Sequence, residues 1–492
     1  MNCIEVKNNQ KFNIDDIKFL SPKTFHDSVG ECLNGGSRMI ALTPIHRHDS
    51  NRIIAVLLKN SNSNIQIIGG NFTDTDYQFE SCSNKFPHTN YFECELAEQF
   101  NYLPLNHPWI RPVRKQNVIL NKIPYEFFKI DGDEIHEVAV GPIHAGVIEP
   151  GHFRFQCHGE IVYNLEINLG YQHRGMEKLF LESNEAQRIV LAESIAGDTT
   201  IGNAFAHCNA VESIKNIKIP LRAEVIRTIA LELERVAMHL ATLGGIANDV
   251  GFALPASSYG RLRTLIINSL AALCGSRFGR GLIIYGGVRF DFNEEIINQV
   301  RKNLSIVKND IREINEYLFS NVGALARFEE TGIVSTELAN KIGLVGLAAR
   351  SAGLNEDIRT NFPFSAYKYH SISTMNLTTG DVYARARLRA LEIDESIRFI
   401  EELISNLPKG DIKTSVGEAT LNSCVISLVE GWRGEILHLC STNNDGKISQ
   451  YKIKDPSFNN WYGLSLALRN TAISDFPLCN KSFDLSYAGH DL

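Results

Sequence analysis

The sequence lacks the paired cysteines that hold a soft metal or form a redox disulfide in most proteins. Ten cysteines are spread over 492 residues, and no two of them have the spacing of a CxxC motif. Thiolate sites usually need such pairs, because one turn of backbone must present two sulfur atoms to the same metal. The spacing therefore argues against a zinc ribbon or a thioredoxin-like disulfide, and we expect most of the cysteines to be buried thiols.

Long apolar runs are missing as well. No stretch approaches the roughly 18 to 20 uninterrupted apolar residues that are needed to span a bilayer. The first residues, MNCIEVKNNQK, have no apolar core of the kind found in a secretory signal. We therefore expect the chain itself to reside in the cytoplasm.

The sequence has neither an excess of basic charge nor a glycine-rich phosphate loop. Its formal net charge is -7, so the overall field attracts neither nucleic acid nor anionic lipid, and we expect no nucleic-acid partner. No glycine-rich loop follows a strand-like run, so direct dinucleotide binding has no support. If NAD is linked to this protein, we expect another subunit to bind it.

The length and a hydrophobic content of 44% are enough for two or three domains. The first, about residues 1–118, alternates short apolar runs with Asn, Ser and Gly, as small α+β domains do. Near its end, Phe92, Leu96 and Phe100 recur every four positions and predict one apolar helix face. Three prolines then favour an extended exit, which places a domain boundary near residues 115–135.

The remainder predicts a β-hairpin followed mainly by helices. Apolar and polar residues alternate over residues 153–169 around a turn at His158 and Gly159. A helical apolar stripe runs from Leu221 and is expected to end at the two glycines 244–245. Similar helical patterns occupy residues 297–319 and 384–405, and residues 410–492 combine strand-like stretches with a helix near residues 461–470.

A series of longer motifs spans nearly the whole chain in a fixed order. They include FECELAEQF, HPWIRPVR, GPIHAG, GYQHRGMEKL, YGGVRFD, GDVYARARLR, EGWRGE and ISDFPLCNKSFDLSYAGHDL. With these motifs the chain resembles the fused large subunit of membrane-bound, formate-hydrogenlyase-type (energy-converting) nickel-iron hydrogenases. It is equally similar to two subunits of respiratory NADH:quinone oxidoreductase joined together, a smaller one followed by a larger one that is itself related to the hydrogenase large subunit.

This resemblance implies an α+β fold with a defined domain order. Residues 1–118 would form a small α+β domain like the smaller of those two subunits, and residues 119–135 a linker. Residues 136–492 would form a mainly helical domain with peripheral β-hairpins, like the nickel-iron hydrogenase large subunit.

Active relatives hold nickel and iron with four thiolates, from a CxxC after the hairpin and a second pair near the C-terminus. By the resemblance, the four positions fall on Ala196, Thr199, Ser486 and Gly489. None of them carries sulfur, and a serine hydroxyl stays protonated at neutral pH where a thiol can ionise. We therefore expect no nickel-iron centre in this chain and no hydrogen turnover. An active hydrogenase with unusual ligands is the alternative.

In the NADH dehydrogenase relatives, the corresponding cavity accepts a quinone headgroup. A histidine from the hairpin loop and a tyrosine after the HRGxEK helix serve there as proton donors. The histidine has counterparts here in His144 or His152, whereas the tyrosine position falls on Gly197. This loss weakens a proton-donor mechanism but leaves room for a quinone, and Tyr171 is close in sequence.

Two charged residues of the HRGMEK motif are candidates by the same resemblance. Glu177 corresponds to a glutamate that carries protons beside the cavity; alternatively, it faces solvent and pairs with Lys178. Arg174 could lie near the iron-sulfur cluster of a partner subunit and raise its potential. The alternative for Arg174 is an ordinary ion pair with a carboxylate such as Glu182.

Asp198 lies within the segment SIAGDTT, where the first thiolate pair is missing. A carboxylate here, close to Glu177, would have its titration coupled to that residue and would suit a proton relay. The alternative, which we favour, is that Asp198 caps the N-terminus of the following helix.

Together these observations predict an oxidoreductase subunit in the peripheral arm of an energy-converting complex, on the cytoplasmic side of the plasma membrane. Electrons would come from a small subunit with an iron-sulfur cluster and enter a cavity bounded by His144, His152, Glu177, Asp198 and Ser486. They would reduce an organic acceptor, with quinone as the first candidate, and drive ion movement in antiporter-like membrane subunits. The rival hypothesis is a non-redox scaffold or conformational coupler for those membrane subunits.

Overall fold

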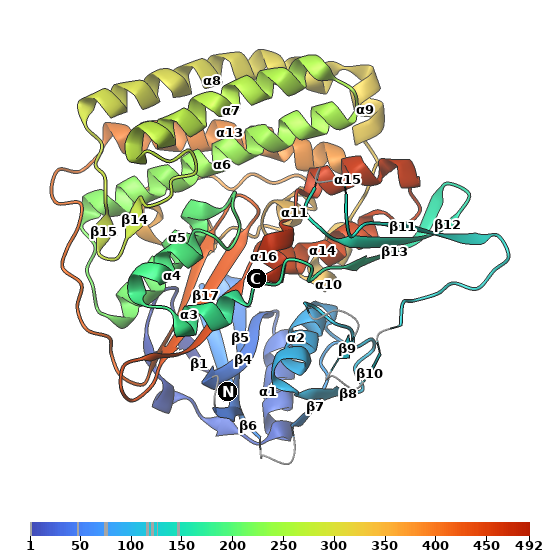
Figure 1. The fold of residues 1–492 in the computed structure, drawn as a ribbon, viewed down its shortest axis with the longest axis vertical. Helices are drawn as coiled ribbons and strands as arrows, with labels where there is room; N and C mark the ends of the chain where they lie inside the picture. The colour runs from blue at the N-terminus through green and yellow to red at the C-terminus, as the bar shows by residue number, and fades with distance from the viewer. Residues whose placement is uncertain are drawn as a thin grey trace.

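Long helices and β-sheets occupy different parts of the molecule, as the α+β class predicted from the sequence requires (Figure 1). The computed structural model describes residues 2–46, 49–72, 77–114, 118–119, 123–124, 126–144 and 148–492. Parts of the predicted boundary, residues 115–117, 120–122 and 125, lie outside these described residues. No helix in the described ranges is both long enough and apolar enough to cross a bilayer.

The first segment is a sheet with two helices on one face. Its strands run in the order β1-β6-β5-β4, and β3 pairs in parallel with β6. Helices α1 (Pro22–Asn34) and α2 (Asn90–Phe100) cover one face and bury Phe25, Phe92 and Leu96. The helix face predicted around Phe92 is thus confirmed. The strands are β1 (Ile4–Val6), β3 (Phe19–Leu20), β4 (Arg38–His46), β5 (Asp49–Lys59) and β6 (Asn64–Asn71), with a separate pair β7 (Gln78–Glu80) and β8 (Leu103–Leu105).

A second sheet joins the two ends of the chain. Its order is β18-β17-β16-β2, so that β2 (Phe12–Asn13) pairs with β16 (Ser423–Glu430) across most of the sequence. The other strands are β17 (Glu435–Thr442) and β18 (Ile448–Lys454). Ile40 and Ile54 of the first sheet belong to the same buried cluster as the helices of the large segment. The first segment therefore shares a hydrophobic core with the rest of the molecule.

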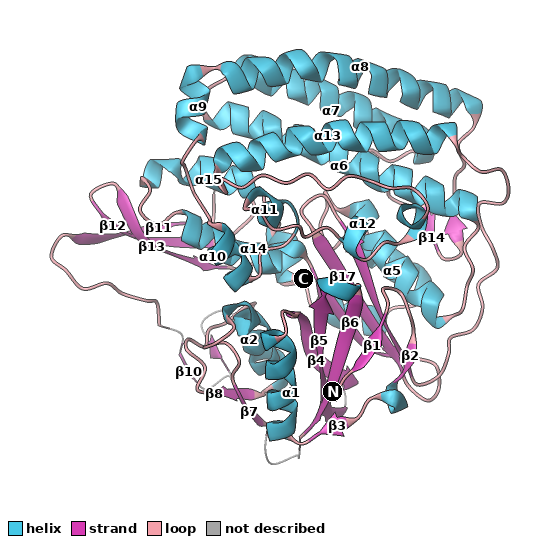
Figure 2. Ribbon diagram, turned by 180° about the vertical axis from the view of Figure 1, so that it is seen from behind, coloured by secondary structure: helices cyan, strands magenta, loops and turns pink. Residues whose placement is uncertain are grey.

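Four long helices form a layer over these sheets (Figures 1 and 2). They are α6 (Leu221–Asp249), α7 (Ala253–Cys274), α8 (Glu294–Ser320) and α13 (Val382–Ser405). The predicted end of α6 at its two glycines is wrong, because the helix continues to Asp249. A Cβ atom at Gly244 would lie 3.3 Å from the carbonyl oxygen of Ala256, and one at Gly245 would lie 2.2 Å from Cε of Lys481. The glycines thus permit close packing and do not terminate the helix.

The predicted hairpin is confirmed as part of a three-stranded arm that projects from the body (Figure 1). Its strands pair antiparallel in the order β11 (Ile135–Val140), β12 (His152–His158) and β13 (Ile161–Asn168). Phe153 and Phe155 point inward and pack against Phe476, with ring centroids 4.8 and 5.0 Å apart. This contact fixes the base of the arm against the C-terminal helices.

The remaining elements connect these parts. Near the candidate site they are α3 (Met176–Glu182), α4 (Glu185–Ala192), α5 (Thr200–Ile214), α14 (Pro456–Ala467), α15 (Phe476–Phe483) and α16 (Tyr487–Asp491). Elsewhere they are β9 (Val118–Ile119), β10 (Ile123–Pro124), β14 (Ile283–Ile284), β15 (Gly287–Val288), α9 (Val322–Phe328), α10 (Thr336–Ile342), α11 (Gly346–Ser351) and α12 (Ile358–Asn361). Seven of the ten cysteines are buried and all ten are free thiols, as expected.

Candidate functional site

The two segments on which the resemblance places the thiolate positions lie side by side. Arg174 donates hydrogen bonds to the carbonyl oxygens of Ser194 and Ile195, at 2.6 and 2.7 Å, and to that of Ala488 at 3.2 Å. One guanidinium group therefore ties the loop before α5 to helix α16. The four aligned positions, Ala196, Thr199, Ser486 and Gly489, belong to this region.

These positions do not fit a nickel-iron group. The Ser486 hydroxyl accepts a hydrogen bond from the backbone N–H of Gly489 at 2.8 Å and so caps α16. A Cβ atom at Gly489 would lie 2.5 Å from Oδ2 of Asp455, so a cysteine side chain there would collide with a buried carboxylate. Among the described residues, no three His, Cys, Asp or Glu side chains are grouped so that they could hold a metal ion.

The guanidinium group of Arg433 also lies in this region, where it contacts Asp198 and Thr199. It makes a two-pronged ion pair with Asp198, with N···O distances of 2.6 and 2.8 Å, and donates to the hydroxyl of Thr199 at 3.2 Å. Its Cζ lies over the ring of Trp432, 3.9 Å from the ring centroid. Burial lowers the pKa of Arg433, but the carboxylates of Asp198, Asp484 and Asp455 together raise it more, so that the guanidinium stays charged.

Asp198 does not have the helix-capping role that we favoured. Its carboxylate pairs with Arg433, and the cap residue of α5 is Thr199, which makes no side-chain cap. The first free N–H groups of α5 instead donate to Glu234 of α6, from Ile201 at 2.7 Å and from Gly202 at 3.1 Å. Burial raises the pKa of Glu234 to about 8, and the nearby Asp198 carboxylate adds to this effect.

The expected coupling between Glu177 and Asp198 is not supported, because the two carboxylates contact different cations. Glu177 accepts from the ammonium group of Lys452 at 2.8 Å and from the backbone N–H of Ile453 at 3.0 Å. Lys452 also pairs with Glu95 of α2 at 2.6 Å. Glu177 is buried, so the alternative of a solvent-facing residue paired with Lys178 is wrong. Lys178 pairs instead with Glu182. Glu182 is therefore not the partner of Arg174, which donates to backbone carbonyl oxygens.

The structure has two cavities near the residues that were expected to bound a single one, and of those five residues only Glu177 lines either of the two. The smaller, of about 230 Å³, is lined by Glu177, His173 and Leu492 among others. The larger, of about 590 Å³, lies where the arm meets the end of α6 and the C-terminal helices. Its lining residues are Val140, Ile148, Phe155, Asp249, Ile473, Ser474, Phe476, Pro477, Asn480, Lys481, Asp484, Leu485 and Tyr487.

The larger cavity combines an apolar wall with a few polar groups. Tyr487 is buried, and among the described residues its hydroxyl makes no hydrogen bond of normal geometry, with Asn480 close by. Burial raises the pKa of Tyr487 to about 12, so the phenol remains a proton donor at neutral pH. Partial burial also raises the pKa of Asp249, against the lowering effect of Lys481. A phenol, the two carboxyl groups of Asp249 and Asp484, and an ammonium group thus border one largely apolar cavity.

His144 and His152 lie at the arm, next to this cavity. The His144 ring shares a hydrogen bond with the carbonyl of Gly151 at 2.9 Å, and that of His152 with the carbonyl of Gly141 at 3.4 Å. Gly151 packs against Tyr487, where an added Cβ atom would lie 2.7 Å from the ring. The loop that carries the histidines is therefore in contact with the cavity, although its residues 145–147 lie outside the described residues.

Gly197, the position of the missing tyrosine, is exposed, and an added Cβ atom there would meet no atom within 4 Å. Tyr487 offers a phenol from a different element. Sequence reasoning pointed to the segment around Ser486 but missed Tyr487, Asp249, Arg433, Glu234 and Lys452. The GWRG context of Arg433 was a signal that went unused, because its partner lies 235 residues away.

Comparison with known proteins shows where this architecture occurs. A family model described as "Respiratory-chain NADH dehydrogenase, 49 Kd subunit" matches residues 249–424. An NADH-quinone oxidoreductase subunit of Bacillus mycoides (strain KBAB4) is 31% identical over 347 residues, which cover 68% of this chain and 93% of the relative. The chain belongs to this NADH dehydrogenase subunit family.

Other relatives extend the match along the chain. Formate hydrogenlyase subunit 5 of Escherichia coli (strain K12) is 27% identical over 437 residues, covering 84% of this chain and 77% of the relative. A solved chain of the membrane-bound sulfane sulfur reductase, an archaeal respiratory membrane complex, superposes with a TM-score of 0.68 at 25% identity. That match covers 74% of this chain and 100% of the solved one. Chains similar to this one are thus found in hydrogenase, quinone oxidoreductase and sulfane sulfur reductase complexes.

Proposed function

We propose that this chain is a peripheral-arm subunit of a membrane-associated redox complex and that it presents an organic electron acceptor in the cavity of about 590 Å³. The observation that carries this proposal is the buried Tyr487 hydroxyl, which lines a largely apolar cavity and makes no hydrogen bond of normal geometry among the described residues. Membership of the NADH dehydrogenase subunit family supports the setting, because the named relatives are subunits of redox enzymes.

A quinone headgroup suits the chemistry of this cavity. Its ring would pack against the apolar wall, and one carbonyl would accept a hydrogen bond from the Tyr487 hydroxyl. Reduction to the quinol takes two electrons and two protons. An iron-sulfur cluster in a partner subunit would supply the electrons, and Tyr487 and Asp249 would pass protons that solvent then replaces.

No step in this proposal uses a nickel-iron centre. The four aligned positions present a methyl, two hydroxyls and a hydrogen atom, and Arg433 binds both Asp198 and Thr199 beside them. Arg174, which ties the two segments together, would face an iron-sulfur partner. The complex would lie on the cytoplasmic side of the plasma membrane, next to antiporter-like subunits, with any NAD bound elsewhere.

A scaffold role is the second candidate. Two losses favour it: none of the four thiolate positions carries a cysteine, and Gly197 stands where the quinone tyrosine is expected. A chain that transfers no electrons needs neither the thiolates nor the tyrosine. In that role the fold would transmit movement between membrane subunits, and the cavity would hold lipid or water.

The test is to purify the native complex through a tag on this chain and to measure electron transfer. We expect the reduced complex to show an iron-sulfur electron paramagnetic resonance signal and to reduce decylubiquinone. The Tyr487→Phe variant should have a kcat for the quinone at least about tenfold lower than the parent, since one proton donor is lost from the cavity. Tyr317→Phe, an exposed tyrosine on α8, is the matched control and should leave kcat unchanged.

Other results would point elsewhere. Reduction of polysulfide but not of quinone would replace the acceptor and keep the redox role, in line with the sulfane sulfur reductase relative. A purified complex without any iron-sulfur signal would favour the scaffold. Equal kcat values for Tyr487→Phe and the parent would remove the tyrosine from the mechanism.

A further inference from the structure

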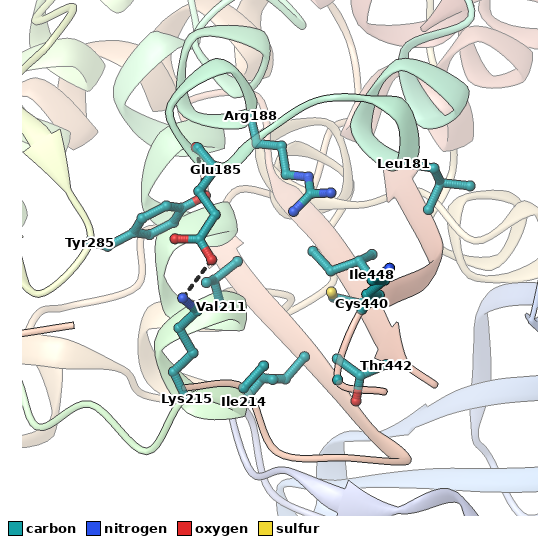
Figure 3. Close-up of a pocket in the computed structure, with 13 residues that line it drawn as sticks. Leu181, Glu185, Arg188, Val211, Ile214, Lys215, Tyr285, Cys440, Thr442 and Ile448 are labelled. Atoms are coloured by element: carbon teal, nitrogen blue, oxygen red, sulfur yellow. Dashed lines mark hydrogen bonds and ion pairs between the residues drawn. The ribbon is translucent and has the colours of Figure 1, made fainter. Parts of the chain in front are cut away.

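A separate cavity, of about 310 Å³, lies away from the cavity of Tyr487 and shares no residue with it. It is formed by α3, α4 and α5 on one side and by the ends of β17 and β18 on the other (Figure 3). Its volume is at the lower end of those of small-molecule sites, which lie at about 300–1,000 Å³. No part of the proposed redox function uses this cavity.

The cavity carries an excess of positive charge. Three cations, Arg188, Lys215 and Lys447, line it together with a single carboxylate, Glu185. Glu185 is already paired with Lys215 at 2.5 Å. Two cationic side chains thus remain, and among the described residues neither has a carboxylate within ion-pair distance. An anion that enters would neutralise charge that the protein itself leaves uncompensated.

The Arg188 side chain is held in place at its base. Its Nε donates to the carbonyl oxygen of Phe180 at 2.6 Å, which fixes the plane of the guanidinium group. The two terminal nitrogens point into the cavity, between Tyr285 and Leu181, in Figure 3. A guanidinium group oriented in this way offers two parallel N–H donors, the geometry that a carboxylate matches.

The rest of the wall is largely apolar. Val211 and Ile214 of α5 face Ile448 of β18 across the cavity (Figure 3). Leu181 and Ala419 also line it. Inorganic ions gain nothing from such a wall, whereas a ligand with a hydrocarbon body gains about 25 cal/mol for each Å² of apolar surface that it buries. The ligand that fits therefore combines an acidic group with an apolar body.

Buried hydrogen bonds hold Tyr285, which lines the cavity, in place without a ligand. The Tyr285 hydroxyl shares a hydrogen bond with Nε2 of the buried His207 at 2.7 Å, and His207 in turn bonds to Tyr451 at 2.5 Å. A preformed site pays little ordering cost on binding.

We infer that this cavity is a binding site for a small organic monocarboxylate, with the carboxylate on Arg188 and the apolar body between α5 and β18. The site is independent of the proposed redox cavity, and its occupancy is a means by which a metabolite could stabilise this face of the chain. If this inference fails, the proposed redox function is not affected, because the two cavities share no residue.

Isothermal titration of the purified full-length chain with benzoate tests this inference. Benzamide, which has nearly the same shape and no charge, is the matched ligand control. We expect benzoate to bind one site with a Kd of about 10 µM to 1 mM, as its small number of atoms allows. Benzamide should bind at least about tenfold more weakly.

Two variants probe the two halves of the site. Arg188→Gln removes the charge and should weaken benzoate binding at least about tenfold. Ala419→Phe fills the apolar part and should abolish binding while keeping every charge. Lys178→Gln, an exposed lysine on α3 outside this cavity, should bind benzoate as the parent does. The thermal unfolding midpoint of each variant shows whether it is folded.

Three results would overturn the inference. The first is an absence of benzoate binding to the folded parent chain. The second is binding of benzoate to the folded Arg188→Gln and Ala419→Phe variants as tightly as to the parent chain. The third is inorganic phosphate binding as tightly as benzoate, which would mean that charge alone acts and the apolar wall contributes nothing.

Discussion

Glu234 caps a helix that it does not belong to. Because Thr199 provides no side-chain cap, the free N–H groups at the start of α5 bind the carboxylate of Glu234 on the neighbouring helix α6. The same carboxylate is fully buried and close to Asp198, and burial raises its pKa to about 8. Two hydrogen bonds to N–H groups oppose this rise. The group is therefore protonated over much of the neutral range in the folded chain.

The raised pKa of Glu234 predicts a pH-dependent stability. Between pH 4.5, the ordinary value, and about pH 8, the folded state keeps a proton that the unfolded state has released. This contribution to stability is fully present below pH 4.5 and is lost as pH rises to about 8, with a slope of at most about 1.4 kcal/mol per pH unit. Glu234→Gln should reduce the slope by the share of this one carboxyl, as measured by urea unfolding of the variant and the parent at pH 5, 6, 7 and 8.

The comparison must be with the parent chain, because other buried carboxyls also titrate. Glu313→Gln, an exposed change on α8, is the matched control and should keep the parent's slope. If Glu234→Gln and the parent lose stability in parallel between pH 5 and 8, Glu234 is ionised in the fold and its role is only structural.

At the scale of elements, a buried chain of hydrogen bonds joins α5 to the second sheet. Tyr451 of β18 bonds to Nδ1 of His207 at 2.5 Å and to Nδ1 of His438 at 2.8 Å, and His438 bonds to Oδ1 of Asn203 at 3.3 Å. Asn203 donates its amide to the carbonyl of Thr199, so its oxygen must accept from His438. Each donor in the chain then points towards Asn203, and a single arrangement of protons satisfies every group.

Removing one hydroxyl from this chain should therefore be costly. Tyr451→Phe leaves the Nδ1 atoms of both buried histidines without their partner. Burial lowers the pKa of His438 to about 3 and that of His207 well below its ordinary value, so neither ring escapes by ionising. We expect a loss of about 2–4 kcal/mol in the free energy of unfolding. Tyr163→Phe on the exposed face of β13 should change it by less than about 0.5 kcal/mol.

Denaturant unfolding of both variants measures the difference. A cost for Tyr451→Phe no larger than that for Tyr163→Phe would mean that the histidines find other partners or water.

The elements differ in how far the sequence could predict them. The Phe92 helix, the hairpin around Gly159 and the start of α6 after Pro220 follow from local patterns, and each is confirmed. The end of α6 does not, because its two glycines serve the packing of α7 and Lys481. The pairing of β2 with β16 joins residues about 410 positions apart, and no local pattern encodes such a partner.

The same distinction holds for the candidate site. The motifs located the segments around Ser486 and Asp198, which do come together. The partners of individual side chains could not be predicted, because Arg433, Glu234 and Lys452 approach from other elements. Asp198 was expected to cap its own helix by a local rule. A tertiary ion pair with a buried guanidinium outweighs that rule here.

At the scale of the whole molecule, buried charges bind the first segment to the rest. Glu95 of α2 pairs with Arg114 and with Lys452 of β18, and Lys452 continues to Glu177 of α3. Burial raises the pKa of Glu95, but Arg114 and Lys452 lower it more, so that the carboxylate remains ionised. Arg114 also donates to the carbonyl of His490 near the C-terminus at 2.9 Å. Together with the shared apolar core, this cluster joins two segments that resemble separate subunits.

A chain cut between the two segments should therefore stay together. A protease site inserted after Asp131, in an exposed loop, would separate residues 1–131 from the rest once cleaved. We expect the cleaved protein to elute from gel filtration as one species of the parent's 55.0 kDa, also in 0.5 M NaCl, because the apolar core and the buried ion pairs are little affected by salt.

Lys452→Met removes the central cation and leaves two buried carboxylates with Arg114 alone. That variant should release the first segment after cleavage, whereas Lys178→Met, an exposed change on α3, should not. Separation of the cleaved parent at low salt would show that the two segments are independent domains held together only by the covalent chain.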